Sequence, residues 1–153
     1  MDPMDEAIRL SIDMMEAGHG GPFGAVVVKD GAIIARGYNR VTSTNDPTAH
    51  AEVVAIREAC QVLGTFQLTG CEVYTSCEPC PMCLAALYWA RPIRVYFACT
   101  REDAARVGFD DQMIYDEIAR PIKERTLELE HVDHPGALEA MKRWNAKQDR
   151  VKY

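Results

Sequence analysis

The sequence predicts a three-layer α/β/α fold, in which helices cover both faces of one mixed sheet of five strands. Three observations predict it. Apolar residues recur at helical spacing in several segments, and short β-branched runs alternate with those segments along the chain. Strands separated by helices need crossovers, which favour parallel pairing. The length of 153 residues, with 48% hydrophobic and 26% charged residues, is typical of one globular domain.

Local signals place the elements in order. The expected helices are residues 5–17, 49–63, 81–90, 114–119 and 135–147. The expected strands are residues 25–29, 32–36, 71–75, 93–98 and 127–132. Asp30-Gly31 predicts a tight turn and an antiparallel hairpin, whereas the last three strands should pair in parallel. Gly64 ends the second helix, and Pro81 suits the first turn of the third. We expect a loop over residues 41–47 and a tail over residues 148–153.

Charge and composition argue against several classes of partner. The chain has 17 basic and 23 acidic residues and a net charge of −6, so we expect no nucleic-acid partner. No apolar run approaches the roughly 20 residues that span a bilayer, so we expect no membrane partner. Residues 1–6 are acidic and do not resemble a signal peptide. We therefore expect a cytoplasmic protein, in which clustered cysteines indicate a metal or catalysis.

One group of residues has the chemistry of a metal site. His50 and Glu52 open the second helix, while Cys80 and Cys83 open the third in Cys-x-x-Cys spacing. Thiolates and imidazole are good zinc ligands, and a helix N-terminus favours thiolates. Three protein ligands leave a fourth position for water, as in catalytic zinc sites, and Glu52 could take the proton of that water. The pattern predicts one Zn²⁺ per subunit.

Two other interpretations of the cysteines stay open. Cys77 could close the zinc site as a fourth ligand, which would make the chain a binding module without catalysis. The spacing Cys77-x-x-Cys80-x-x-Cys83 also resembles part of an iron–sulfur run, but no fourth cysteine follows and His50 would have no role. The other cysteines are expected to be small core residues: Cys60, Cys71 and Cys99.

The order His-x-Glu followed by Pro-Cys-x-x-Cys is the signature of the zinc nucleobase deaminases. Further blocks extend the likeness over nearly the whole chain: Gly21–Ala25, Asn45–Glu52, Tyr74–Cys83, Tyr88–Pro92, Gly108–Asp111, Ile114–Tyr115 and Lys152–Tyr153. With them the chain resembles the bacterial guanine deaminases of the cytidine-deaminase-like superfamily. The central blocks are shared with tRNA adenosine deaminases, whereas Phe109-Asp110-Asp111 and Tyr153 are more particular to the guanine branch.

The resemblance implies a fold and a set of site residues. Residues 1–153 would form one zinc-dependent deaminase domain with a cytidine-deaminase-like fold. The implied metal ligands are His50, Cys80 and Cys83, and the implied catalytic residues are Glu52 and Asp111. The implied substrate-binding residues are Phe23, Asn39, Ala51, Trp89, Phe109 and Tyr153. Phe23 would pack on the purine, Asn39 would hydrogen-bond it, and Asp111 would contact the leaving amino group. Residues 148–153 would cap the site, swapped between the subunits of a homodimer.

The implied reaction is the hydrolytic deamination of guanine to xanthine and ammonia. A zinc-activated water would attack C2 of guanine, and Glu52 would carry the proton to the ring and to the departing amine. Related substrates stay open: guanosine, ammeline, cytosine, cytidine and tRNA adenosine. The acidic net charge argues against tRNA, because phosphate binding needs a basic surface.

Overall fold

The computed structural model describes residues 1–153, which form two compact units, Met1–Met113 and Ile114–Tyr153. The first unit contains one four-stranded sheet. Its strands are β1 (Gly24–Lys29), β2 (Ala32–Tyr38), β3 (Cys71–Cys77) and β4 (Arg94–Cys99). Its helices are α1 (Pro3–Glu16), α2 (Val41–Thr44), α3 (Ala51–Leu63), α4 (Pro81–Ala90) and α5 (Arg101–Arg106). None of the chain's helices combines the length and apolar character that a membrane crossing requires.

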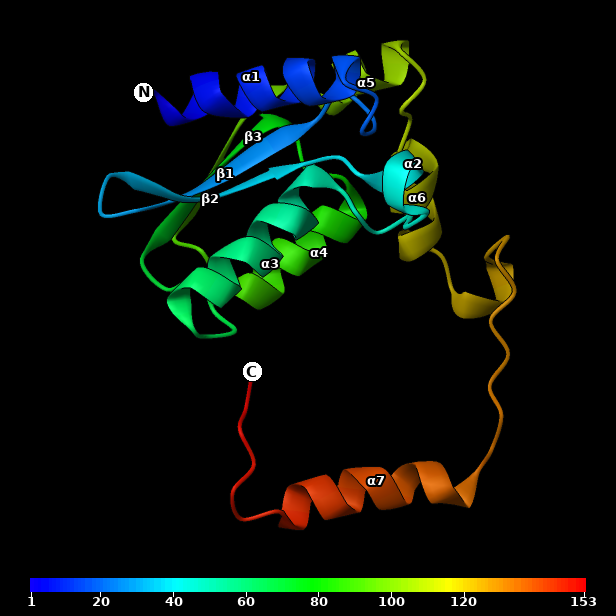
Figure 1. The fold of residues 1–153 in the computed structure, drawn as a ribbon. Helices are drawn as coiled ribbons and strands as arrows, with labels where there is room; N and C mark the ends of the chain where they lie inside the picture. The colour runs from blue at the N-terminus through cyan, green and yellow to red at the C-terminus, as the bar shows by residue number, and fades with distance from the viewer. The chain divides into compact units, whose positions relative to one another are not determined.

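The sheet has the strand order β2-β1-β3-β4 and is mixed, as predicted. β1 pairs antiparallel with both β2 and β3, whereas β3 and β4 pair in parallel. In Figure 1, α1 lies on one face of this sheet, and α3 and α4 lie together on the other face. The three-layer arrangement predicted from the sequence is therefore confirmed for the first unit.

The prediction of a fifth strand is wrong. Residues 128–132 have no regular secondary structure and join no sheet. Leu127, Leu129 and Val132 are all exposed. Alternating apolar side chains indicate an extended, two-faced segment, but a strand also needs a neighbour to accept its backbone hydrogen bonds. The parallel pairing expected of the last three strands is confirmed for β3 and β4 only.

Two short helices are present in addition to the predicted ones, and one of them lies in an expected loop. α2 lies inside the segment 41–47, and α5 follows β4 directly. α5 begins with a capping box: the Thr100 hydroxyl accepts from the Asp103 amide, and the Asp103 carboxylate accepts from the Thr100 amide. Such reciprocal caps satisfy two amide groups at a helix start, so even a six-residue helix can form here.

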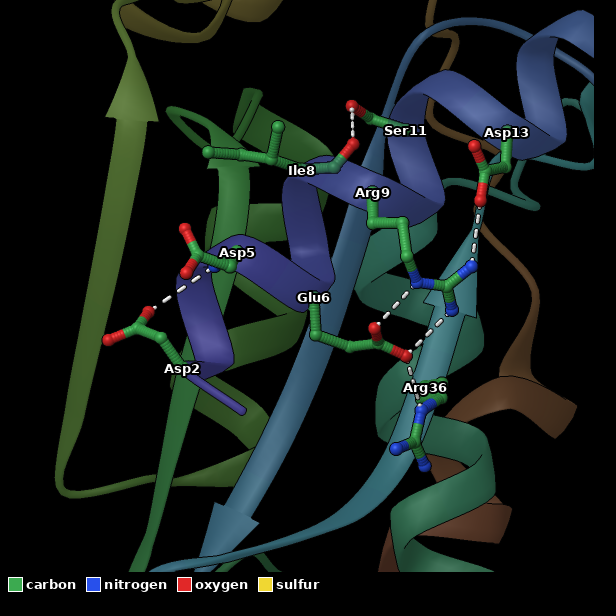
Figure 2. A network of polar contacts seen from close by, with 8 residues as sticks. All are labelled: Asp2, Asp5, Glu6, Ile8, Arg9, Ser11, Asp13 and Arg36. Carbon is green, nitrogen blue, oxygen red and sulfur yellow. Dashed lines mark hydrogen bonds and ion pairs between the residues drawn. The ribbon is translucent and has the colours of Figure 1, made fainter.

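The face of the sheet under α1 is held by close packing and by charge. α1 begins at Asp2, whose carboxylate accepts from the amide of Met4 at 2.8 Å. Gly24 allows α1 to approach β1, because a Cβ there would lie 2.2 Å from the carbonyl oxygen of Ala7. Figure 2 shows Glu6 of α1 between two guanidinium groups, Arg9 of the same helix and Arg36 of β2.

The opposite face forms the main core. α3 buries Ala51, Ala55 and Ala59, and α4 buries Leu87, against apolar side chains of the sheet such as those of Val27 and Val73. The small side chains allow a short distance between helix and sheet. This packing fixes where α3 and α4 begin.

The second unit contains most of α6 (Gln112–Ala119), the 3-10 turn η1 (Ile122–Glu124) and α7 (Pro135–Ala146). Arg125 closes the end of α6, since its guanidinium donates to the carbonyl oxygens of Glu117, Ile118 and Arg120. α7 begins at His134, whose Nδ1 accepts from the amide of Gly136. The helices predicted at 114–119 and 135–147 are therefore confirmed within one to two residues.

Candidate active site

The sheet topology brings the predicted site residues to one edge. β2 and β3 both run antiparallel to β1, so β2 and β3 point in the same direction and end at the same edge. α3 begins shortly after β2, and α4 begins shortly after β3. His50 is the N-cap of α3 and Cys80 is the N-cap of α4. The two helix starts therefore meet beside the carboxyl ends of their strands, which is where open α/β sheets form ligand sites.

Three side chains form a ligand cluster at these helix starts. Nδ1 of His50 lies 3.4 Å from the Sγ of Cys80 and 3.4 Å from the Sγ of Cys83. All three ligand atoms lie within 4.8 Å of one another. Tetrahedral zinc with sulfur and nitrogen ligands requires separations of about 3.6 Å. The predicted metal ligands are thus brought together in a geometry that fits zinc, and their soft sulfur and imidazole donors suit it.

Hydrogen bonding within the cluster favours the ionised form of one cysteine, Cys80. The hydrogen bond from the Cys83 thiol lowers the pKa of Cys80 to about 4, with burial opposing it and His50 assisting. The same bond, with burial, raises the pKa of Cys83. The hydrogen bond with Cys80 in turn raises the pKa of His50. Cys80 is therefore the thiol that is more readily ionised, and binding of a cation by all three side chains would also require Cys83 to lose its proton.

Glu52 lies beside the cluster on the first turn of α3. Its side chain is only 6% exposed. Burial raises the pKa of its carboxyl, and the nearby Cys80 adds to the effect. The Thr75 hydroxyl lies 3.3 Å from Oε1 of Glu52. A buried carboxyl with a raised pKa is suited to accept and return a proton near neutral pH.

Cys77 lies outside the ligand cluster. Its thiol lies 3.7 Å from the carbonyl oxygen of Thr100 and donates to it. Burial raises the pKa of this thiol to about 11, which keeps it protonated. The geometry thus gives the metal three protein ligands. Of the cysteines expected in the core, Cys71 is buried and Cys60 is partly buried against it, whereas Cys99 is exposed because β4 is an edge strand.

Asn39 and two aromatic rings lie together near the same edge. Oδ1 of Asn39 accepts from the amides of Gly21 and Val41, at 3.2 and 3.1 Å. The carboxamide is therefore oriented with its NH₂ group as the remaining donor. Phe23 meets Phe109 edge to face, with ring centroids 4.9 Å apart. A flat aromatic ligand with acceptor atoms on its edge matches such a lining.

The other four predicted residues differ in how close they lie to the ligand cluster. Ala51 is buried at the first position of α3, between His50 and Glu52. Asp111 lies within electrostatic range of Cys80, and burial raises the pKa of its carboxyl. Trp89 is 61% exposed and lies on α4 nine residues after Cys80, about 13 Å along the helix axis. Tyr153 belongs to the second unit, so its place at the site stays a prediction.

The sequence reasoning missed two residues of the site. Gly20 has no space for a side chain, since a Cβ would lie 2.4 Å from the backbone and side-chain oxygens of Asn39. The absence of a side chain at Gly20 therefore makes room for Asn39, and the amide of the next residue, Gly21, donates to its Oδ1. The sequence pattern predicts Thr75 only as part of the strand 71–75. A hydroxyl residue in the buried row of an otherwise apolar strand was the available signal.

The fold and the three-ligand site define a zinc-dependent deaminase. The chain belongs to the family of the cytidine and deoxycytidylate deaminase zinc-binding region, whose model matches residues 2–99. Guanine deaminase of Bacillus subtilis is 54% identical over 150 residues, which are 98% of this chain and 96% of that protein. A crystal structure of Bacillus subtilis guanine deaminase superposes with a TM-score of 0.97 at 52% identity, covering 100% of this chain and 99% of that chain. The resemblance predicted from the motifs is confirmed.

Relatives that act on tRNA match a smaller part of the chain. The tRNA-specific adenosine deaminase of Aquifex aeolicus is 51% identical over 77 residues, which are 50% of this chain and 51% of that protein. A structure of guanine deaminase from Nitrosomonas europaea gives a TM-score of 0.68 at 34% identity and covers 71% of this chain and 63% of that chain. Of these three proteins, the Bacillus subtilis guanine deaminase is the one whose similarity covers nearly the whole chain, and therefore also the second unit.

Proposed function

We propose that the protein is a guanine deaminase, which converts guanine and water to xanthine and ammonia. The observation that carries this proposal is the extent of the similarity. Bacillus subtilis guanine deaminase matches 98% of the chain, whereas the Aquifex aeolicus tRNA deaminase matches 50%. The motif resemblance assigns Phe109, Asp111 and Tyr153 to the guanine branch, and these residues are expected to shape the substrate pocket.

The chemistry divides between the metal and the chain. Zinc held by His50, Cys80 and Cys83 would acidify a water molecule at the open fourth position. Glu52 accepts one proton of the water and delivers it to a ring nitrogen of guanine. It then takes the remaining proton from the hydroxyl group on C2 and delivers it to the amine, which leaves as ammonia while the C2 carbonyl forms. Its burial suits this role, because a carboxyl shielded from bulk water keeps both protonation states accessible.

The pocket residues recognise the base in this proposal. The rings of Phe23 and Phe109 offer apolar contact to the flat purine. Asn39 donates from its amide nitrogen to an acceptor on the purine edge, since its oxygen is already held by two backbone amides. Asp111 accepts from the departing amino group. Ala51 lies between His50 and Glu52 and would border the base. Trp89 and Tyr153 are assigned to the pocket by the sequence resemblance alone, since Trp89 is exposed on α4 and Tyr153 belongs to the second unit.

We propose further that residues 1–153 work as one deaminase domain in a cytoplasmic homodimer, in which residues 148–153 are swapped and cap the site. The support is the amount of exposed apolar surface in both units. Leu138 and Met141 of α7 are 64% and 65% exposed, and Tyr88 of α4 is 77% exposed. Leu138 and Met141 lie three positions apart and so share a face of α7, and large exposed apolar side chains on one face mark a contact with another surface.

The test is ammonia release by the zinc-loaded protein with guanine, guanosine, ammeline, adenine, cytosine, cytidine and tRNA. We expect turnover of guanine well above the others. Glu52→Ala should keep one zinc per chain and lower kcat at least about 100-fold, the usual contribution of general acid–base catalysis. Glu58→Ala, an exposed glutamate on the same helix, is the matched control and should leave kcat unchanged. Faster turnover of another substrate, or an active Glu52→Ala variant, would contradict the proposal.

A further inference from the structure

Thr75 places a hydroxyl where its strand otherwise contributes apolar side chains. The β3 residues that face α3 and α4 include Cys71 and Val73, both in the main core. Thr75 continues this row and is 1% exposed. A buried hydroxyl destabilises a fold unless it is hydrogen-bonded, and valine would fill the same space without that penalty. The hydroxyl therefore needs a specific partner.

The hydroxyl has two neighbours and one proton to give. Oγ1 of Thr75 lies 3.3 Å from Oε1 of Glu52 and 3.1 Å from the carbonyl oxygen of Cys77. A carbonyl can only accept, and a carboxylate can only accept, so the hydroxyl donates to one of them at a time. A charged acceptor makes the stronger hydrogen bond, which favours donation to an ionised Glu52.

Metal binding leaves this contact intact. The Glu52 side chain also hydrogen-bonds the side chain of Cys83. A cysteine that binds zinc does so as a thiolate and has no proton to donate. Of these two side-chain donors to Glu52, only the Thr75 hydroxyl is independent of the metal.

The hydroxyl is also held rigidly. β3 is paired on both sides, and Thr75 lies opposite Ala25 of β1 and Phe97 of β4. Threonine is β-branched, so its χ1 angle is restricted. A donor on such a strand fixes the position of one oxygen of the carboxylate and with it the orientation of the group.

We propose that Thr75 is a positioning residue for Glu52: its hydroxyl donates to Oε1 and so fixes the orientation of the carboxylate beside the ligand cluster. This inference rests on the proposed function, in which Glu52 moves the proton. The hydrogen bonds of the Thr75 hydroxyl are with Glu52 and with the carbonyl oxygen of Cys77, so it would act through Glu52.

The kinetic test compares two substitutions at this position. Thr75→Val removes the hydroxyl and keeps the shape, so kcat for guanine should fall about tenfold while KM and the zinc content stay unchanged. Thr75→Ser keeps the hydroxyl and should retain kcat within about twofold. Ser76→Ala is the matched control. It removes a buried hydroxyl on the same strand, one that accepts from the Gly24 amide, and should leave kcat unchanged.

A second readout does not depend on activity. Thr75→Val should lower the urea midpoint of unfolding in the wild-type background and much less in the Glu52→Ala background, because the hydroxyl then has no carboxylate to hold. This coupling separates the two proposals: it persists even if the protein does not turn over guanine. Equal effects in both backgrounds, a wild-type kcat for Thr75→Val, or loss of its zinc would each overturn the positioning role.

Discussion

Glu6 offers a direct test of how α1 is held on the sheet. Its carboxylate is 2% exposed and accepts from Arg9 at 2.8 and 2.9 Å and from Arg36 at 2.7 Å. Arg36 lies on β2, so this cluster ties the first helix to the sheet (Figure 2). Glu6→Gln keeps the shape of the side chain and removes the charge, which leaves two guanidinium groups without their carboxylate.

The size of the effect follows from the pKa of Glu6. Its hydrogen bonds with Arg9 and Arg36 outweigh burial and lower the pKa from 4.5 to about 2. A shift of this size corresponds to about 3 kcal/mol at neutral pH. Because both arginines are about half exposed, solvent screening reduces the expected value to about 2 kcal/mol. A lowered carboxyl pKa stabilises the fold above pH 4.5, and this stabilisation is lost as the pH falls from 4.5 towards 2.

The assay is urea unfolding of the wild type and Glu6→Gln between pH 7 and pH 3.5. The difference in unfolding free energy should be about 2 kcal/mol at pH 7 and about half of that at pH 3.5. Taking the difference removes the acid-induced release of zinc, which affects both proteins. Asp13→Asn is the control, because Asp13 pairs with the same Arg9 at an exposed position and should change stability by less than about 0.5 kcal/mol. A difference that does not vary with pH would refute the reasoning.

Three further predictions concern the metal and the packing around it. Removal of zinc by a chelator should lower the thermal midpoint, and zinc but not magnesium should restore it, because the ligands are two thiolates and an imidazole. Gly37→Ala should destabilise the protein by more than about 2 kcal/mol in urea unfolding, because the new Cβ would lie 2.2 Å from the carbonyl oxygen of Ala51. Cys77→Ala should keep one zinc per chain by metal analysis, since its thiol lies outside the ligand cluster; loss of the metal would restore the four-ligand interpretation.

The metal site could be predicted from the sequence because its signals are local. His50 and Cys80 each precede a helix, and the start of α4 is marked by Pro81. Cys83 follows one turn later, so the ligand spacing and the helix start support one another. The fold class followed from the order of these elements in the same way.

The features that were missed depend on contacts between distant parts of the chain. Residues 127–132 have the alternation of a strand but no neighbouring strand, which no local pattern reports. A glutamate in the first turns of a helix is expected to be exposed. Glu6 is buried, and its carboxylate pairs with Arg36, which lies 30 positions away in the sequence. Thr75 gains its role from Glu52, 23 positions away. Pairings of this kind become visible only when the topology is known.

β2 connects these distant contacts to the site. Arg36 lies on the α1 side of the sheet, where Glu6 holds it. Gly37 lies on the other side, against the first turn of α3 that follows His50. Asn39 follows directly and is held by the Gly21 amide. Residues 36–39 thus contact α1 on one face of the sheet and α3 on the other, and they end in the amide that we propose binds the base. Substitutions at Gly37 should therefore disturb stability and zinc binding together, whereas those at Glu6 should affect stability alone.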